Sequence, residues 1–149
     1  MDVILWRHCD AAPGVADESR ALSPRGVRQA EAMARWLLSR LPADCRIVAS
    51  PALRAQQTAQ ALGRAFVTDQ RLASGVEAED VIAAIGWPNA GGTVLVVGHQ
   101  PTLGHAASLL LDGEADDRSI RTGEALWLSS NEADASRATL VRGMAPDVI

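Results

Sequence analysis

The sequence contains no lysine, no tyrosine, one phenylalanine and only two cysteines in 149 residues. The scarcity of cysteine excludes a small disulfide-rich scaffold, and both thiols are expected to be reduced. No apolar run reaches the roughly 18–20 residues that a membrane-spanning helix needs, so we expect no membrane association. The 14 basic residues are all arginine, which a bias in coding composition explains more simply than selection for guanidinium chemistry.

The charge balance and the length narrow the class of protein further. A net charge of −4 disfavours nucleic acid as the main partner. Hydrophobic residues make up 48% and charged residues 21% of the chain, as in globular proteins. A chain of this length supplies one core and is short for two, so we predict a single domain over residues 1–149. The N-terminus enters an apolar run without a basic leader, and we expect a cytoplasmic protein.

Short apolar runs alternate with helical repeats along most of the chain. Strands are predicted from Asp2 to Arg7 and at 46–50, 65–67, 93–98, 124–129 and 138–142, the last two as a possible antiparallel pair. Helices are predicted at 24–41, 52–63, 78–86 and 101–111, the first capped by Ser23 with Pro24 in its first turn. This alternation predicts an α/β protein, a three-layer α/β/α sandwich on a mostly parallel sheet.

Two of the predicted strands end in a histidine. The first run ends at Arg7-His8, and the run at 93–98 ends at His99. In open α/β sheets, ligands bind at the carboxyl ends of the strands, so both imidazoles are expected at one edge of the sheet. An arginine beside a histidine there suggests a phosphate that one side chain holds and the other attacks.

A third segment, at 50–59, adds a second arginine, Arg54, at the start of a predicted helix. Guanidinium groups match phosphate oxygens bidentately and favour the charge of a transferring phosphoryl group. An imidazole between arginines is held neutral, because like charges disfavour its protonated form. A neutral imidazole is what a nucleophile on phosphorus requires.

These segments resemble the histidine phosphatases, the phosphoglycerate-mutase-like family. The resemblance rests on Arg7-His8-Cys9, on the segments at 22–30 and 50–59, and on Gly98-His99-Gln-Pro101, and it extends from residue 2 to about 129. It implies a phosphoglycerate mutase-like fold. It also implies that His8 is the phosphorylated nucleophile, that Arg7 and Arg54 clamp the phosphate, and that His99 stabilises the transferring phosphoryl group.

Within the family, the chain looks most like the short bacterial phosphohistidine phosphatases of the SixA type. They share its small size, an Asp-Ala pair after the first motif (Asp10-Ala11 here), and an arginine before the Leu-Ser turn, which is Arg20 here. The likeness implies that Arg20 binds substrate at the rim of the pocket. It also implies a protein partner that carries phosphohistidine, such as a histidine phosphotransfer domain, and no metal or other cofactor.

Two positions depart from the family pattern. The glycine that usually follows the first histidine is Cys9, which is not the nucleophile of a cysteine phosphatase because Val15 stands where that motif needs arginine. Many relatives carry an acid directly after the second histidine, where this chain has Gln100. Three residues lie in the other region where the family places a general acid: Glu77, Glu79 and Asp80.

The departure at Gln100 bears on the substrate. A departing alcohol needs a proton, and a general acid contributes roughly 10²–10⁴-fold, whereas transfer from phosphohistidine to His8 exchanges one P–N bond for another. Only 44 residues, positions 55 to 98, separate Arg54 from His99, which leaves no room for a capping insertion. A phosphohistidine phosphatase is therefore the leading hypothesis. The alternatives are a phosphomonoesterase for a small metabolite, with Glu77 or Glu79 as acid, and a non-catalytic module that binds phosphoproteins.

Other polar residues have simpler interpretations. His105 is expected at the surface of a helix, and the spacing of His8, Cys9, His99 and His105 matches no common zinc site. Three arginines fall along the first predicted helix: Arg25, Arg28 and Arg35. A solvated helix face explains them most simply, and docking of a partner is the alternative.

Overall fold

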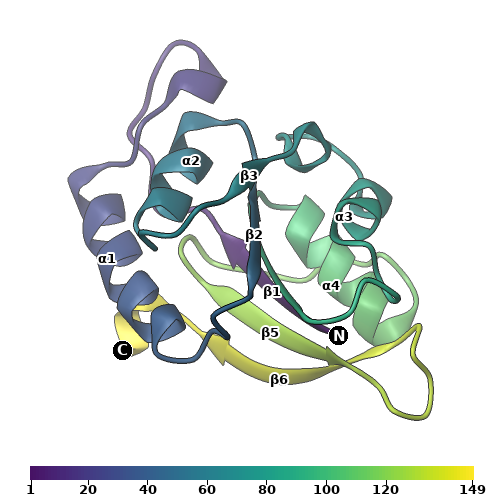
Figure 1. Ribbon diagram of the computed structural model, residues 1–149. Helices are drawn as coiled ribbons and strands as arrows, with labels where there is room; N and C mark the ends of the chain where they lie inside the picture. Colours follow the sequence, from purple (N-terminus) through teal and green to yellow (C-terminus); the bar gives the residue numbers. More distant parts are fainter.

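A six-stranded mixed sheet forms the centre of the molecule, and helices cover both of its faces (Figure 1). The computed structural model describes all residues from Met1 to Ile149. The strands are β1 (Asp2–Arg7), β2 (Arg46–Ala49), β3 (Val67–Thr68), β4 (Thr93–Gly98), β5 (Ala125–Ser130) and β6 (Ala138–Met144). Their order in the sheet is β3-β2-β4-β1-β5-β6. Strands β1 to β4 pair in parallel, and β5 and β6 continue the sheet antiparallel, which confirms the predicted α/β architecture.

The four helices form two layers. They are α1 (Pro24–Leu38), α2 (Leu53–Gln60), α3 (Ala78–Ile85) and α4 (Thr102–Asp112). Three short 3-10 turns complete the chain: η1 (Asp17–Ser19), η2 (Gln70–Leu72) and η3 (Pro146–Val148). Helices α1 and α2 pack on one face of the sheet and α3 and α4 on the other (Figure 1). No helix is both long and apolar enough to cross a bilayer.

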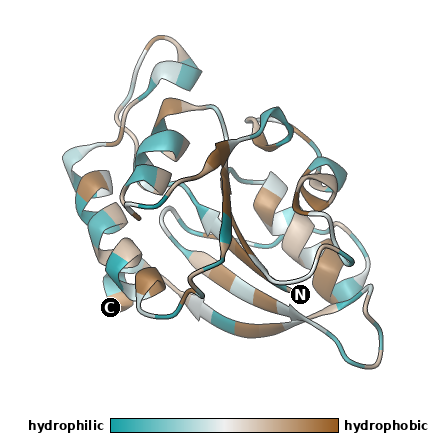
Figure 2. Cartoon of the chain, viewed as in Figure 1, coloured by the Kyte–Doolittle hydropathy of each residue, from teal (hydrophilic) through white to brown (hydrophobic).

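Strand β1 divides the interior into two hydrophobic clusters. Val3 and Leu5 belong to the cluster under α3 and α4, whereas Ile4 and Trp6 belong to the cluster under α1 and α2. All four side chains are fully buried. A central strand covered on both faces needs apolar residues at every position instead of alternate ones, which explains the continuous hydrophobic run of β1. The inner strand β2 is likewise mostly brown in Figure 2.

The start of α1 is fixed against the loop that follows β1. The Ser23 hydroxyl accepts a hydrogen bond from the Gly26 N–H at 3.0 Å, as expected for an N-cap. A side chain on Gly26 would overlap the carbonyl oxygen of Asp10. Glycine at this position therefore lets the first turn of the helix lie directly on the segment that follows His8.

Several predicted elements differ from the structure at their ends, most by one or two residues, and helix α2 stops at Gln60, three residues before the predicted end. Helix α1 stops at Leu38 and not at Leu41, because the N–H groups of Arg40 and Leu41 both turn back to the Leu37 carbonyl. Strand β3 has two residues and begins at Val67. It pairs only with the last residues of β2 at the edge of the sheet, and both of its side chains are exposed.

Candidate active site

His8 follows β1 and lies at the carboxyl edge of the parallel strands. Its Nδ1 is 2.8 Å from the carbonyl oxygen of Cys9, so Nδ1 carries the proton and donates it, and Nε2 keeps its lone pair. Burial, and to a lesser extent the charges of three arginines, lower the pKa of His8 to about 4. His8 is therefore neutral at pH 7, as a nucleophile must be.

His99 occupies the matching position after β4. Arg7 pairs with Gly98 across the parallel strands, so the two histidines leave the sheet at the same level. Their ring centroids are 5.1 Å apart. The Nη2 of Arg54 lies 3.4 Å from His99 Nδ1, which must accept because arginine only donates. His99 Nε2 then donates to the Ser50 hydroxyl at 2.7 Å. Burial, followed by the charges of His8 and Arg54, lowers the pKa of His99 to about 3.

Arg7 and Arg54 present buried donors to this edge. Arg54, in the first turn of α2, is 3% exposed. Arg7 is half-buried and donates from Nη1 to the Ile120 carbonyl at 2.9 Å. In both side chains the Nε–H group is buried without a hydrogen-bond partner. Such unsatisfied donors are rare in folded proteins, and here they flank two neutral imidazoles, which makes this edge of the sheet suited to an oxyanion.

Asp17, in η1, is the carboxylate that binds Arg54 and Arg20, and no sequence pattern indicated it. Arg54 donates to the Asp17 carbonyl at 2.7 Å and to its carboxylate at 3.1 Å. Arg20 donates to the same carboxylate at 3.0 Å and to the Ala12 carbonyl. These hydrogen bonds hold the pKa of Asp17 below its usual range. Asp17 is therefore an ionised acceptor, and its loop of small and acidic residues follows no pattern that singles it out.

Thr58 joins the end of β1 to α2. Its hydroxyl accepts from the Cys9 N–H at 3.1 Å and donates to the Arg54 carbonyl at 2.8 Å. Cys9 itself is fully buried, and burial raises the pKa of its thiol to about 12. A thiol in that state is not a nucleophile, and Cys9 packs as a small core residue.

The candidate acids lie at the start of α3, on the face of the sheet opposite to α1 and α2. The Asp80 carboxylate accepts from the Glu77 N–H at 3.0 Å, and Glu77 and Glu79 are exposed. Thr102, at the start of α4, donates to the Val76 carbonyl at 2.7 Å, so Glu77 lies beside the segment that follows His99. No hydrogen bond or ion pair joins the three carboxylates to His8 or His99.

Gln100 has a structural role and not the role of a general acid. Its amide group donates to the Arg118 carbonyl at 2.8 Å and accepts from the Gly104 N–H at 2.7 Å. The side chain thereby fastens the start of α4 to the segment between α4 and β5. An amide group is not a proton donor for a leaving group at neutral pH. Gln100 instead holds the start of α4 in position.

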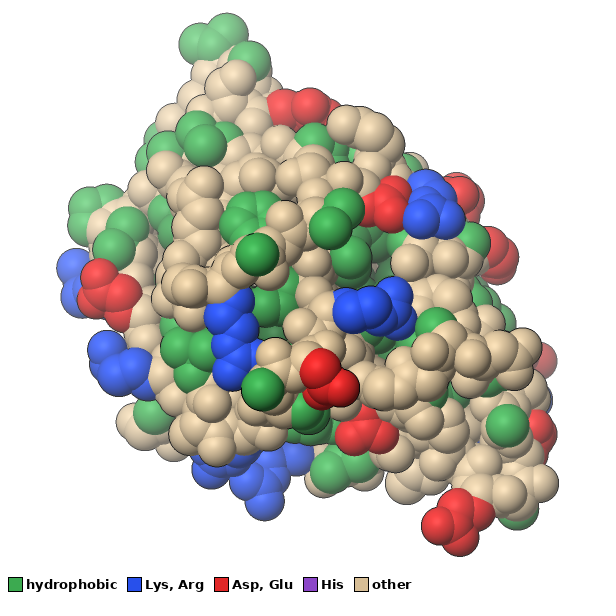
Figure 3. Space-filling model, in the orientation of Figure 1, with side chains coloured by type: hydrophobic (Ala, Val, Ile, Leu, Met, Phe, Trp, Pro, Cys, Tyr) green, Lys and Arg blue, Asp and Glu red, His purple; other side chains and the backbone are tan.

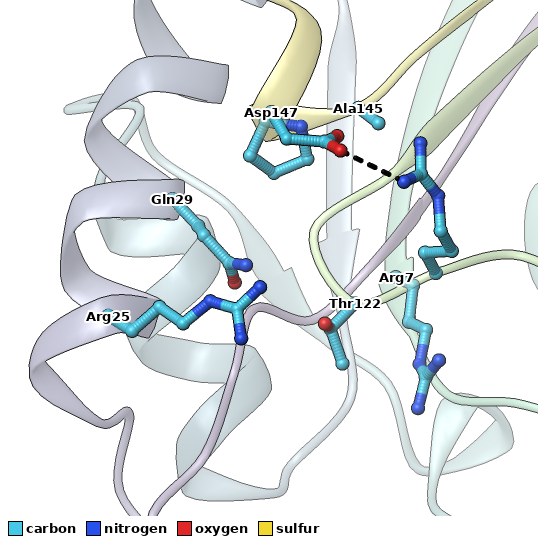
Figure 4. Close-up of a pocket in the computed structure, with 8 residues that line it drawn as sticks. Arg7, Arg25, Gln29, Thr122, Ala145 and Asp147 are labelled. Carbon is cyan, nitrogen blue, oxygen red and sulfur yellow. Dashed lines mark hydrogen bonds and ion pairs between the residues drawn. The ribbon is translucent and has the colours of Figure 1, made fainter.

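The segment before β5 returns to the edge of the sheet that carries His8. The Gly123 N–H donates to the His8 carbonyl at 3.1 Å, and Trp6 donates from its indole to the Gly123 carbonyl. A pocket of about 320 Å³ opens beside Arg7 between this segment and α1 (Figure 4). No group of three or more His, Cys, Asp or Glu side chains is arranged to hold a metal ion. The positive charge at this edge comes from arginine.

Comparison with known proteins agrees with this geometry. The family model of the histidine phosphatase superfamily (branch 1) matches residues 3–76. Phosphohistidine phosphatase SixA of Escherichia coli (strain K12) is 32% identical over 127 residues, 76% of each chain. The solved structure of the protein histidine phosphatase SixA complexed with tungstate has a TM-score of 0.85 at 27% identity and 99% coverage of both chains. A structure described as SixA from Nakamurella multipartitia has a TM-score of 0.83 at 32% identity, covering 97% of this chain and 95% of that one.

Proposed function

The chain belongs to the histidine phosphatase superfamily, and on that premise we propose that it removes phosphate from phosphohistidine on a partner protein. The reaction passes through a phosphohistidine intermediate on His8. The observation that carries the proposal is the state of this side chain. His8 is a neutral imidazole whose Nδ1–H donates a hydrogen bond to the Cys9 carbonyl and whose Nε2 is unprotonated and lies among arginines.

The first step is attack of His8 Nε2 on phosphorus. A bond forms between Nε2 and phosphorus, the P–N bond to the donor histidine breaks, and its electron pair passes to the donor ring. A donor ring protonated on its other nitrogen leaves as neutral imidazole, so no carboxylic acid has to supply a proton. This fits Gln100 after His99 and the exposed position of Glu77.

The second step uses the same tautomer. Water attacks phosphorus, and His8 leaves as a neutral imidazole because the Cys9 carbonyl has kept its Nδ1 proton in place. Arg7 and Arg54 stabilise the oxygens of the phosphoryl group in both steps. The negative charge of that group raises the pKa of His99 from its low value. His99 Nδ1 then takes a proton from solvent, gives up its contact with Arg54 Nη2 and donates to a phosphoryl oxygen.

The comparisons support this choice within the family. The Escherichia coli relative is a phosphohistidine phosphatase, and the SixA structure that the chain matches over 99% of its length binds tungstate, a tetrahedral oxyanion. Arg20, bonded to Asp17 and contributing to the low pKa of His8, is proposed to contact the substrate at the rim of the site.

A substrate panel tests the reaction. Phosphohistidine in a carrier protein and p-nitrophenyl phosphate, whose leaving groups need little protonation, are expected to turn over about 10²-fold faster than glycerol phosphate, the scale of an absent general acid. Glu77→Gln is expected to change turnover of phosphohistidine only a few-fold. Fast hydrolysis of glycerol phosphate with a loss of about 10²-fold in Glu77→Gln would instead identify a metabolite phosphomonoesterase. Binding of the carrier without turnover of any substrate would identify a binding module.

A trapping experiment tests the nucleophile. Protein quenched in alkaline detergent after exposure to a ³²P-labelled substrate is expected to carry acid-labile, base-stable phosphate. His8→Ala should carry none, because no other imidazole has a comparable Nε2. His105→Ala is the matched control, since His105 pairs with Asp117 outside the site. Undiminished label in His8→Ala would overturn the assignment.

A further inference from the structure

The pocket beside Arg7 is rich in arginine. Its lining consists of Arg7, Arg25, Gln29, Arg121, Thr122, Ala145, Pro146 and Asp147. In Figure 4, Arg25 extends from α1 toward Gln29 and Thr122, and Arg7 lies across from it. The pocket therefore adjoins the phosphate clamp through Arg7, but most of its lining has no part in the chemistry described above.

Most of the charge in this pocket is unpaired. Arg25 forms no ion pair, and Arg7 bonds only to a carbonyl oxygen. Arg121 pairs with Asp147 at 3.1 Å, with the side chains 58% and 65% exposed. An ion pair that exposed is weak and exchanges easily for another carboxylate. Three arginines against one aspartate leave a positive pocket on a protein whose net charge is −4.

A second cavity extends the pocket along α1. It measures about 240 Å³ and shares Arg25, Gln29, Pro146 and Asp147 with the first while adding Arg28. We call the two cavities together the basic groove, defined by Arg7, Arg25, Arg28 and Arg121. On the surface shown in Figure 3, carboxylates are more frequent toward α3 and α4 than over α1. Arg35, about two turns beyond Arg28 on the same helix, lines neither cavity.

Backbone contacts fix the groove relative to His8. The Gln29 side chain accepts from the Asp10 N–H at 2.9 Å, two residues after His8. The Gly123 N–H donates to the His8 carbonyl, which positions Arg121 and Thr122. A group bound in the groove therefore lies at a fixed offset from a phosphoryl group on His8, as a subsite for the same substrate requires.

We propose that the basic groove binds carboxylate side chains of the partner protein next to its phosphohistidine, and that Asp147 occupies Arg121 until the partner's carboxylate replaces it. This inference rests on the proposed function and names the feature by which the partner is selected. The arginines are spread over two adjoining cavities, which suits several carboxylates along a protein segment better than one further phosphate. Charge pairs at such a rim act mainly on association and specificity.

Two phosphohistidine peptides of equal length test the groove, one with Asp and Glu around the phosphohistidine and one with Asn and Gln. The wild-type protein is expected to prefer the acidic peptide by about 10-fold in kcat/KM, and the preference should shrink at high salt. The double variant Arg25→Gln/Arg121→Gln should lose most of that preference through KM. Its activity on p-nitrophenyl phosphate, which carries no second anion, should stay within about 2-fold of wild type. Arg35→Gln, which removes the same charge from the same helix outside the groove, should retain the preference.

Each other outcome has a distinct meaning. If wild-type protein hydrolyses both peptides equally well, the groove is no subsite, although the proposed function stands. If it hydrolyses neither peptide, the proposed function fails. An equal loss on p-nitrophenyl phosphate in the double variant would show that the arginines serve the fold or the chemistry, and would overturn the inference. A third arm measures inhibition by 2,3-bisphosphoglycerate, which carries two phosphates. If the double variant loses this inhibition more strongly than it loses peptide turnover, the groove binds a second phosphate and not carboxylates.

Discussion

Under the proposed function, Asp17 competes with the substrate for Arg54. Its carboxylate and carbonyl oxygens take donors of the buried guanidinium that a phosphoryl group also needs, and Arg20 holds the carboxylate in place. A phosphate that enters the site must therefore displace or share this contact. The result is a clamp whose affinity for phosphate is moderated, which favours release of the product.

At this residue we predict that Asp17→Asn binds phosphate more tightly. Removing one exposed negative charge beside Arg54 should lower the inhibition constant of inorganic phosphate by about 3-fold, the scale of an exposed charge pair. The measurement is competitive inhibition of p-nitrophenyl phosphate hydrolysis. Asp69→Asn is the matched control, because Asp69 forms a comparable pair with Arg71 away from the catalytic histidines. Weaker inhibition by phosphate in Asp17→Asn would contradict the competition.

Arg7, His8 and His99 were predictable from strand ends, a rule that depends only on where apolar runs stop. Arg54 was predictable from its place at the start of a helix. The structure brings Arg7, His8, Arg54 and His99 together at that edge. The sequence could not reveal Asp17, because its position depends on a loop held by side-chain contacts to Arg54 and Arg20. The sequence also left open how close Glu77 lies to His99, since that depends on one hydrogen bond between the starts of two helices.

At the scale of elements, helix α1 and the loop after β1 act as one unit. Ser23 bonds to Asp10, Gln29 bonds to the Asp10 N–H, and Gly26 lies against the Asp10 carbonyl. The helix that carries the groove arginines is thereby attached to the segment that positions His8. Any change that lifts the first turn of α1 should disturb both the groove and the nucleophile.

Gly26→Ala tests this attachment. In an exposed helix the change to alanine stabilises by roughly 1 kcal/mol, but here the added methyl group overlaps the Asp10 carbonyl. We expect a net destabilisation of about 2 kcal/mol, typical of overpacking, with a lower kcat for p-nitrophenyl phosphate. Urea denaturation and steady-state kinetics give the two readouts. Gly143→Ala is the control, since a Cβ there meets only an ordinary contact with Leu126. A stabilised Gly26→Ala protein would show that the helix moves without cost.

The elements themselves were largely predictable. The predicted strands at 93–98, 124–129 and 138–142 correspond to β4, β5 and β6, and β5 and β6 are antiparallel as proposed. Strong periodicity and the Ser-Pro opening located α1 as well. The order of the strands and the return of residues 120–123 to the end of β1 depend on tertiary contacts such as the Trp6 indole bond, for which the sequence offers no local pattern.

For the whole molecule, the buried histidines link stability to pH. Burial lowers the pKa of His8 to about 4 and of His99 to about 3, whereas histidine in the unfolded chain titrates near 6.5. Between about pH 6.5 and pH 4, the unfolded chain binds protons that the folded protein does not. Stability therefore rises with pH across this window and is lost as the pH falls. The lowered pKa of Asp17 acts in the same direction at lower pH.

We predict that the free energy of unfolding falls as the pH is lowered from 7 to about 4, with a contribution from His8 of at most about 3 kcal/mol. Urea titrations at a series of pH values measure it. His8→Gln removes one titrating group and should give a shallower dependence on pH than the wild-type protein shows. Parallel curves for wild-type protein and His8→Gln would show that His8 titrates normally in the folded state.

Strand β1 separates the α1–α2 layer of the molecule from the α3–α4 layer. The phosphate clamp at Arg54 and the groove arginines of α1 stand on the layer that packs against Ile4 and Trp6, while Glu77 stands on the layer that packs against Val3 and Leu5. Substitutions that reshape the α3–α4 layer meet a different set of core neighbours from those that support the clamp. If Arg54 holds phosphate as proposed, a proton donor on the α3–α4 layer can be gained or lost, and the class of leaving group can change with it, without rebuilding the phosphate site.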